Sequence, residues 1–217
     1  MESGKWGIKI EGGWFSQEGH TYRDDAGTVV LSSTKVFDVL GISDFSMVNT
    51  ENLEWKRGFG DAVHAGVEYL VADDLDWDSL DEEVIPAVTG IEQFLKKVEY
   101  QSEACEERRI HSFNGMKCGM TLDHRGTLIH QGVRRHAVLD LKTGSKFEQY
   151  WNWQLGSYIC PQPKVDLGWV GVILQVDKDG NVKPHYLKDV EAAKREFQML
   201  LAAAILKLNN GYANLGG

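Results

Sequence analysis

The sequence predicts an α/β fold in which a mixed, mostly antiparallel sheet is flanked by helices. Three patterns lead to this expectation. Apolar residues recur at helical spacing in several stretches, short β-like runs separated by turn residues occupy the middle of the chain, and a continuous apolar run of strand length follows them. A length of 217 residues fits one domain spanning 1–217, and no linker long enough to divide the chain is apparent.

The first part of the chain is expected to be loosely organised. Residues 1–27 are rich in glycine and polar residues, and they fit either a loose arm or a short hairpin. A strand-like run at 28–31 comes next, followed by a short capped helix at 36–40 that ends near Gly41.

Two amphipathic helices are expected before the middle of the chain. Apolar residues at helical spacing predict the first over 60–70, and those between 88 and 98 predict the second after Pro86. The acidic run between them, at 73–83, is expected to be a solvated loop.

The middle of the chain changes to a β-like pattern. Runs around 106–111, 116–122 and 136–141 are expected to be strands of an antiparallel meander. Asn-Gly at 114–115 is a strong hairpin signal, and the segment 126–132 is expected to be a loop.

The last part of the chain returns to alternating elements. A helix is expected over 145–159, where Pro161 and the proline two residues later stop it. A buried strand at 169–176 then leads through a hairpin turn at 177–181 to another short strand. The long amphipathic pattern from 189 to 208 predicts a closing helix.

Composition excludes several classes of protein. No apolar run approaches the roughly 20 residues that a membrane-spanning helix needs. The start of the chain lacks a basic-then-apolar signal, and three scattered cysteines suggest reduced thiols, so an intracellular, cytoplasmic protein is expected.

The charge is unevenly distributed. A net charge of −9 at first argues against a nucleic-acid partner. However, seven acids and no base lie in 73–83, whereas 108–146 holds eight Lys or Arg residues against two aspartates. The middle of the chain is therefore locally basic.

Those two aspartates belong to the pattern that carries chemistry. Asp123 is followed, after sixteen intervening residues, by Asp140-Leu141-Lys142. Strand alternation directs Asp140 and Lys142 to one face of the sheet. Carboxylates from adjacent strands suit Mg²⁺ or Mn²⁺, and a nearby lysine can orient or deprotonate water and stabilise charge on a phosphate. By itself so short a pattern is common and more often describes a structural Asp–Lys pair at a strand end.

Neighbouring residues make the pattern more specific. Arg57-Gly58 and His64 precede it, Gly119 opens the run that ends at Asp123, Thr143-Gly144 follows Lys142, and Gln154 is spaced four residues from Tyr158. This ordered set resembles the RecB-type and phage-type exonuclease branch of the PD-(D/E)XK nuclease superfamily over residues 57–158.

The resemblance implies a restriction-endonuclease-like core and Mg²⁺- or Mn²⁺-dependent hydrolysis of DNA. An exonuclease acting on single- or double-stranded DNA ends in recombination, repair or phage DNA processing is the main expectation. A structure-specific or restriction-type endonuclease, and a non-cutting module that binds nucleic acid or a partner protein, are the alternatives.

The resemblance also assigns roles to matching residues. Asp123 and Asp140 would be metal ligands, Lys142 the catalytic lysine and His64 a further ligand. The upstream catalytic acid and ligand would be Glu107, which has the best spacing.

The upstream acid has two competitors, Glu106 and Glu103. A solvated acidic cluster is the simpler interpretation of both Glu107 and Glu106.

DNA contacts are expected from two further places. Gln154 and Tyr158 share a helix face that meets DNA in the family, although an ordinary polar patch would look the same. Arg134 and Arg135 make the segment before Asp140 basic, so it would either follow a phosphate backbone or be a mobile loop.

The resemblance also bears on cofactors and partners. Three scattered cysteines cannot supply the four ligands of an iron–sulfur cluster, so none is expected. A ring-like homo-oligomer and a single-strand-annealing partner protein are compatible with the resemblance, as is a phage-encoded protein that acts in the host cytoplasm. No membrane association is expected.

Overall fold

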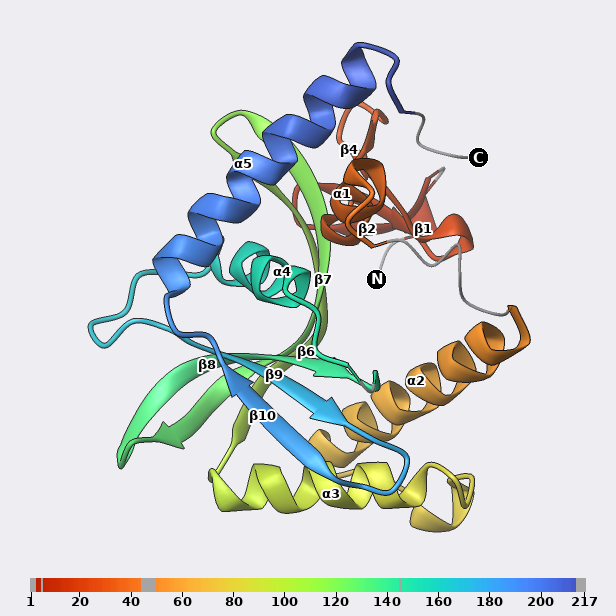
Figure 1. Ribbon diagram of the computed structural model, residues 1–217, viewed down its shortest axis with the longest axis vertical. Helices are drawn as coiled ribbons and strands as arrows, with labels where there is room; N and C mark the ends of the chain where they lie inside the picture. The colour runs from red at the N-terminus through yellow and green to blue at the C-terminus, as the bar shows by residue number, and fades with distance from the viewer. Residues whose placement is uncertain (1–2, 5, 44–49, 145, 214–217) are drawn as a thin grey trace.

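A five-stranded sheet in the order β10-β9-β8-β7-β6 forms the centre of the computed structural model, which describes residues 3–4, 6–43, 50–144 and 146–213 (Figure 1). All its neighbouring strands are antiparallel except β8 and β9, which are parallel and are connected through a helix. The α/β class and the mixed, mostly antiparallel sheet are confirmed. The strands are β6 (Gln101–Phe113), β7 (Met116–His130), β8 (Val133–Lys142), β9 (Val170–Val176) and β10 (Val182–Tyr186).

Helices cover both faces of this sheet (Figure 1). The buried clusters separate by face: Leu139 and Leu141 of β8 pack with one pair of helices, whereas Val138 packs with the other three. Alternation along β8 thus supplies a hydrophobic layer on each side. The first pair is α2 (Thr50–Val71) and α3 (Ile85–Lys97), and the other helices are α1 (Ser33–Leu40), α4 (Tyr150–Ile159) and α5 (Val190–Asn209).

Two tight turns determine the register of the central hairpins. Asn114 and Gly115 have φ of 52° and 85°, as a two-residue β-turn with left-handed residues requires, so the Asn-Gly prediction is confirmed. Gln131 and Gly132 form a similar turn with φ of 52° and 78°. The expected loop at 126–132 is therefore wrong: most of it belongs to β7, because its residues pair with β8.

The N-terminal residues form neither a loose arm nor a single hairpin. They build a second, five-stranded antiparallel meander, whose Phe15 and Tyr22 pack with Ile110 of β6. Gly119 of β7 allows this contact, because a Cβ there would lie 2.1 Å from the Tyr22 ring. The strands are β1 (Ser3–Gly4), β2 (Gly7–Ile10), β3 (Gly13–Ser16), β4 (Thr21–Asp24) and β5 (Val29–Val30), with the 3₁₀ turn η1 (Glu18–His20) before β4.

The helices follow the predicted apolar patterns. Ser32 caps α1 by accepting a hydrogen bond from the Lys35 amide, and Gly41 ends it with φ of 73°. Helix α4 begins at Tyr150, later than expected. The acidic run contains only a short 3₁₀ turn, η2 (Trp77–Ser79), and no helix of the described residues has the length and apolar character to cross a membrane.

Candidate active site

Three carboxylates lie at the same level on adjacent strands of the central sheet. The register pairs on either side place Glu106 of β6 opposite Asp123 of β7. Asp140 of β8 comes one residue after the last β7–β8 pair, Leu139 with His124. Antiparallel pairing thus brings together residues that are far apart in sequence.

Helix α2 adds an imidazole to this level of the sheet. Ligand atoms of His64, Glu106 and Asp123 all lie within 4.8 Å of one another, and Nδ1 of His64 is 3.7 Å from Oδ2 of Asp123. Carboxylate oxygens and an imidazole nitrogen are ligands for divalent cations. Two like charges opposite each other across strands are unfavourable, so a bound cation would relieve their repulsion.

Glu106 reaches this group from a strained backbone. Its φ is 48°, in the left-handed region that a non-glycine residue seldom adopts and that is concentrated at functional sites. Burial raises the pKa of its carboxyl, and the Asp123 carboxylate raises it further. Arg108 counters this with an ion pair of 2.8 Å, while its guanidinium lies over the Phe15 ring.

Asp140 and the partly exposed Lys142 form an ion pair beside this group. Asp140 is fully buried, and the Lys142 ammonium lies 3.0 Å from its Oδ1, to which it donates, and 2.8 Å from its Oδ2. The Oδ2 atom nevertheless accepts no hydrogen bond of acceptable geometry from the described residues. Burial raises the pKa of Asp140 to about 6, against the opposing effect of Lys142. Burial lowers the pKa of Lys142, but the Asp140 and Asp123 carboxylates outweigh it, so its pKa is raised.

Asp123 connects the two parts of the site. Its Oδ2 accepts a hydrogen bond of 2.8 Å from the Leu141 amide, which attaches β7 to β8 beyond their last paired residues. Its side chain is 12% exposed, unlike that of Asp140, which is fully buried. Asp123 therefore lies near His64 and also near the Asp140–Lys142 pair. Its negative charge raises the pKa of Asp140 and the pKa of Lys142.

Gln154 and Tyr158 lie behind the carboxylates in the protein interior. They are only 5% and 3% exposed, and Nε2 of Gln154 lies 2.6 Å from the Tyr158 hydroxyl. Burial raises the pKa of Tyr158 well above its usual value, and the Asp140 and Asp123 carboxylates raise it further. The two side chains thus face the site from the core, whereas a DNA-contacting surface was expected.

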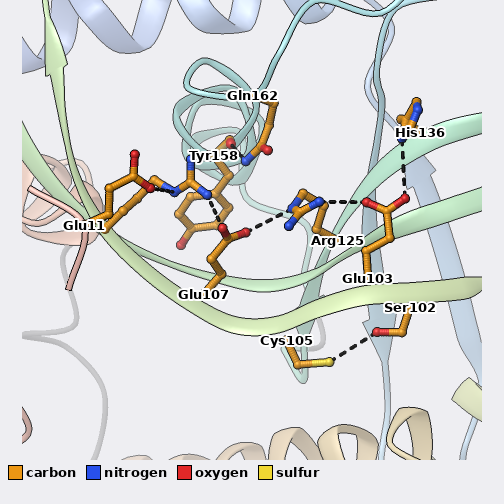
Figure 2. Close-up of polar contacts among 10 residues, drawn as sticks. Glu11, Ser102, Glu103, Cys105, Glu107, Arg125, His136, Tyr158 and Gln162 are labelled. Atoms are coloured by element: carbon orange, nitrogen blue, oxygen red, sulfur yellow. Dashed lines mark hydrogen bonds and ion pairs between the residues drawn. The ribbon is translucent and has the colours of Figure 1, made fainter. Parts of the chain in front are cut away.

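Glu107 lies outside the ligand group. Its carboxylate is bound by Arg109 and Arg125, and Arg125 also pairs with Glu103 at 2.7 Å (Figure 2). Of the three glutamates considered as the upstream acid, only Glu106 belongs to the group with His64. The Asn-Gly turn contained the signal for this, because counting back from it places Glu106 opposite Asp123.

Arg134 and Arg135 also lie away from the carboxylates. They are near the start of β8, about 20 Å along the strand from Asp140 at some 3.3 Å per residue. Arg134 pairs with Glu99 at 3.2 Å, and Arg135 donates to the carbonyls of Leu167 and Gly168.

The locally basic segment is largely neutralised by its neighbours. Each of its eight cations contacts an acid or a backbone carbonyl, and most of these acids lie outside the segment. A count over 108–146 misses this because most of the paired acids lie just before or after the segment, or on other elements of the fold. The cations are Arg108, Arg109, Lys117, Arg125, Arg134, Arg135, Lys142 and Lys146.

Comparisons with known proteins find distant similarity in structure alone. The chain matches no family model, and no curated protein is similar to it in sequence. It resembles a protein of Eubacterium rectale provisionally named an exonuclease, with 14% identity, a TM-score of 0.48 and coverage of 85% of this chain and 83% of that chain. It also resembles the alkaline exonuclease of Laribacter hongkongensis, with 10% identity, a TM-score of 0.43 and coverage of 84% and 89%. These similarities are too low to assign a family, so the function is inferred from the geometry of the site.

Proposed function

We propose that this protein is a divalent-metal-dependent nuclease of the PD-(D/E)XK type that hydrolyses phosphodiester bonds at DNA ends. The observation that carries this proposal is the convergence of Glu106, Asp123 and Asp140 from three adjacent strands, beside His64 and Lys142. If Asp140 and Lys142 were only a structural ion pair, there would be no reason for Glu106, Asp123 and His64 to lie beside them.

The donor atoms fit a hard divalent cation, Mg²⁺ or Mn²⁺. His64, Glu106 and Asp123 would hold it, while the Asp140 carboxylate lies beside them and is paired with the Lys142 ammonium. This assigns the upstream acid to Glu106 in place of Glu107, whose oxygens are occupied by two arginines. When bound, such a cation supplies Lewis acidity toward phosphate and water.

Lys142 supplies the positive charge that phosphodiester hydrolysis requires near the phosphate. The Asp140 and Asp123 carboxylates favour the protonated ammonium, which can donate a hydrogen bond to developing negative charge on the phosphate. The Asp140 carboxylate holds the ammonium in place. Behind them, Gln154 and Tyr158 form a buried support for the site.

The proposal is tested by digesting end-labelled single- and double-stranded DNA with Mg²⁺. We expect the wild-type protein to release nucleotides and chelation to abolish release. Lys142→Ala should reduce the rate at least about 100-fold, because removal of one electrostatic donor costs this much in other enzymes. Lys146→Ala is the matched control, since that side chain is 84% exposed and outside the site.

Two outcomes would contradict the proposal. Full activity of Lys142→Ala would show that the lysine is not needed for hydrolysis. Full activity in the presence of chelator would show that hydrolysis does not depend on a metal. Cleavage of covalently closed circular DNA would identify an endonuclease instead of an exonuclease.

A further inference from the structure

Gln175 is the one polar side chain of strand β9 (Val170–Val176). The other six residues of the strand are glycine or aliphatic. The residue is buried, with 8% of its surface exposed, and the parallel β8–β9 register places it beside Lys142. A buried amide in an apolar strand is costly unless its donors and acceptor are satisfied.

Both ends of the Gln175 amide make short hydrogen bonds. Its Nε2 donates to the Gly144 carbonyl at 2.6 Å, and its Oε1 lies 2.9 Å from Nε2 of His185 on β10. A flipped amide would place oxygen against a carbonyl, so only one orientation satisfies Gly144. Because Oε1 is an acceptor, His185 must carry a proton on Nε2 and donate to it.

These bonds hold the chain where it leaves the proposed catalytic strand. Gly144 is two residues beyond Lys142 and the last residue of the motif that begins at Asp140. The ring of His185 in turn packs against Phe147, with 4.6 Å between ring centroids. The chain is therefore tethered at Gly144 and again at Phe147, just before α4.

We propose that Gln175 is a positioning residue that fixes the Lys142 ammonium by clamping Gly144, with His185 holding the clamp in its orientation. This inference rests on the proposed nuclease function. Without the clamp, the chain just beyond the β8–β9 ladder loses its attachment to β9, and misplacement of a catalytic group by about 1 Å costs roughly 100-fold in rate.

The test compares DNA hydrolysis by variants that remove different parts of the clamp. Gln175→Met keeps the length of the side chain but removes both hydrogen bonds, and Gln175→Glu replaces the donor to Gly144 with an acceptor and adds a negative charge. Both should lower kcat about 10- to 100-fold while KM for DNA changes less than about twofold. His185→Phe keeps the ring stack on Phe147 and should have a smaller effect on kcat.

The matched control is Gln198→Met on α5. The Gln198 amide also bonds at both ends, to Asn114 and Cys160, but lies away from Lys142. We expect its kcat to be unchanged. Fluorimetric melting of every variant separates loss of fold from loss of position.

Three results would overturn the inference: unchanged kcat in Gln175→Met, an equal loss in Gln198→Met, or a loss explained by the unfolded fraction alone. An inactive wild-type protein would instead contradict the proposed function, so the two failures are distinguishable.

Discussion

Neighbouring residues in one strand can have unrelated roles, as Glu106 and Glu107 show. The first carboxylate lies with His64 and Asp123, while the second forms ion pairs with Arg109 and Arg125 (Figure 2). Their difference depends on strand alternation, and on the left-handed backbone of Glu106. Spacing from Asp123 alone does not distinguish the two adjacent acids, but the register counted from the Asn-Gly turn does, and their environments agree with it.

Glu106→Gln and Glu107→Gln should therefore have different effects on Mn²⁺ binding. We expect the first to weaken binding at least about 10-fold, because it removes a charged ligand, and the second to leave affinity nearly unchanged. Isothermal titration calorimetry with Mn²⁺ measures both affinities. Equal losses in the two variants would contradict the assignment of Glu106.

At the scale of elements, the N-terminal sheet is attached to the central sheet by one aspartate as well as by apolar contacts. Asp24, at the end of β4, accepts from the amides of Ala26 and Thr28 and from the Lys117 ammonium of β7 at 2.8 Å. The Lys117 hydrogen bond is the main cause of the lowered pKa of Asp24, although burial opposes it. The Asp24 carboxylate therefore stabilises two features at once: the turn before β5, through the two amides, and the contact between the sheets, through Lys117.

Asp24→Ala should reduce the free energy of unfolding by about 1–3 kcal/mol, since it leaves these donors without an acceptor. The neighbouring Asp25→Ala should cost less than about 1 kcal/mol, because its ion pair with Lys9 is exposed. Urea unfolding measures both.

The sign of the pH dependence follows from the lowered pKa. The stabilisation by Asp24 is present above the unfolded value of 3.8 and is lost as pH falls through the folded value. The difference between wild type and Asp24→Ala should therefore shrink below about pH 4. A difference that persists at low pH would show that the lost interaction is not ionic.

For the whole molecule, the three layers bring the site together from separate elements. Helix α2 on one face supplies His64, the sheet supplies the acids and lysine, and α4 on the other face supplies Tyr158. The gathered carboxylates disfavour the folded state when no cation is present, because burial and mutual repulsion raise the pKa values of Glu106 and Asp140.

Mn²⁺ should consequently stabilise the whole fold. At a free concentration of 100 times the dissociation constant, linkage predicts about 2.7 kcal/mol, seen as a higher melting temperature in a thermal scan. Excess chelator should reverse the shift, and Asp123→Asn should show little of it. An identical shift in Asp123→Asn would place the binding elsewhere.

Much of the fold follows from local patterns in the sequence. The apolar spacing of α3, the Asn-Gly turn, and the apolar run of β9 each depend on neighbours in the chain. The prediction of a loop at 126–132 was wrong because glycines such as Gly126 and Gly132 are typical of loops in a sequence. In the structure Gly126 instead allows close strand approach, since a Cβ there would lie 2.0 Å from the Gln101 carbonyl oxygen.

By itself the sequence determined the strands that carry Asp123, Asp140 and Lys142, and the turn that sets the register of β6 against β7. Those features depend on alternation and turn chemistry, which act over a few residues. The meeting of Glu106 with His64, the burial of Tyr158 and the pairing of the arginines depend on tertiary packing. Burial and electrostatic pairing depend on which distant segments meet, and no local pattern specifies that.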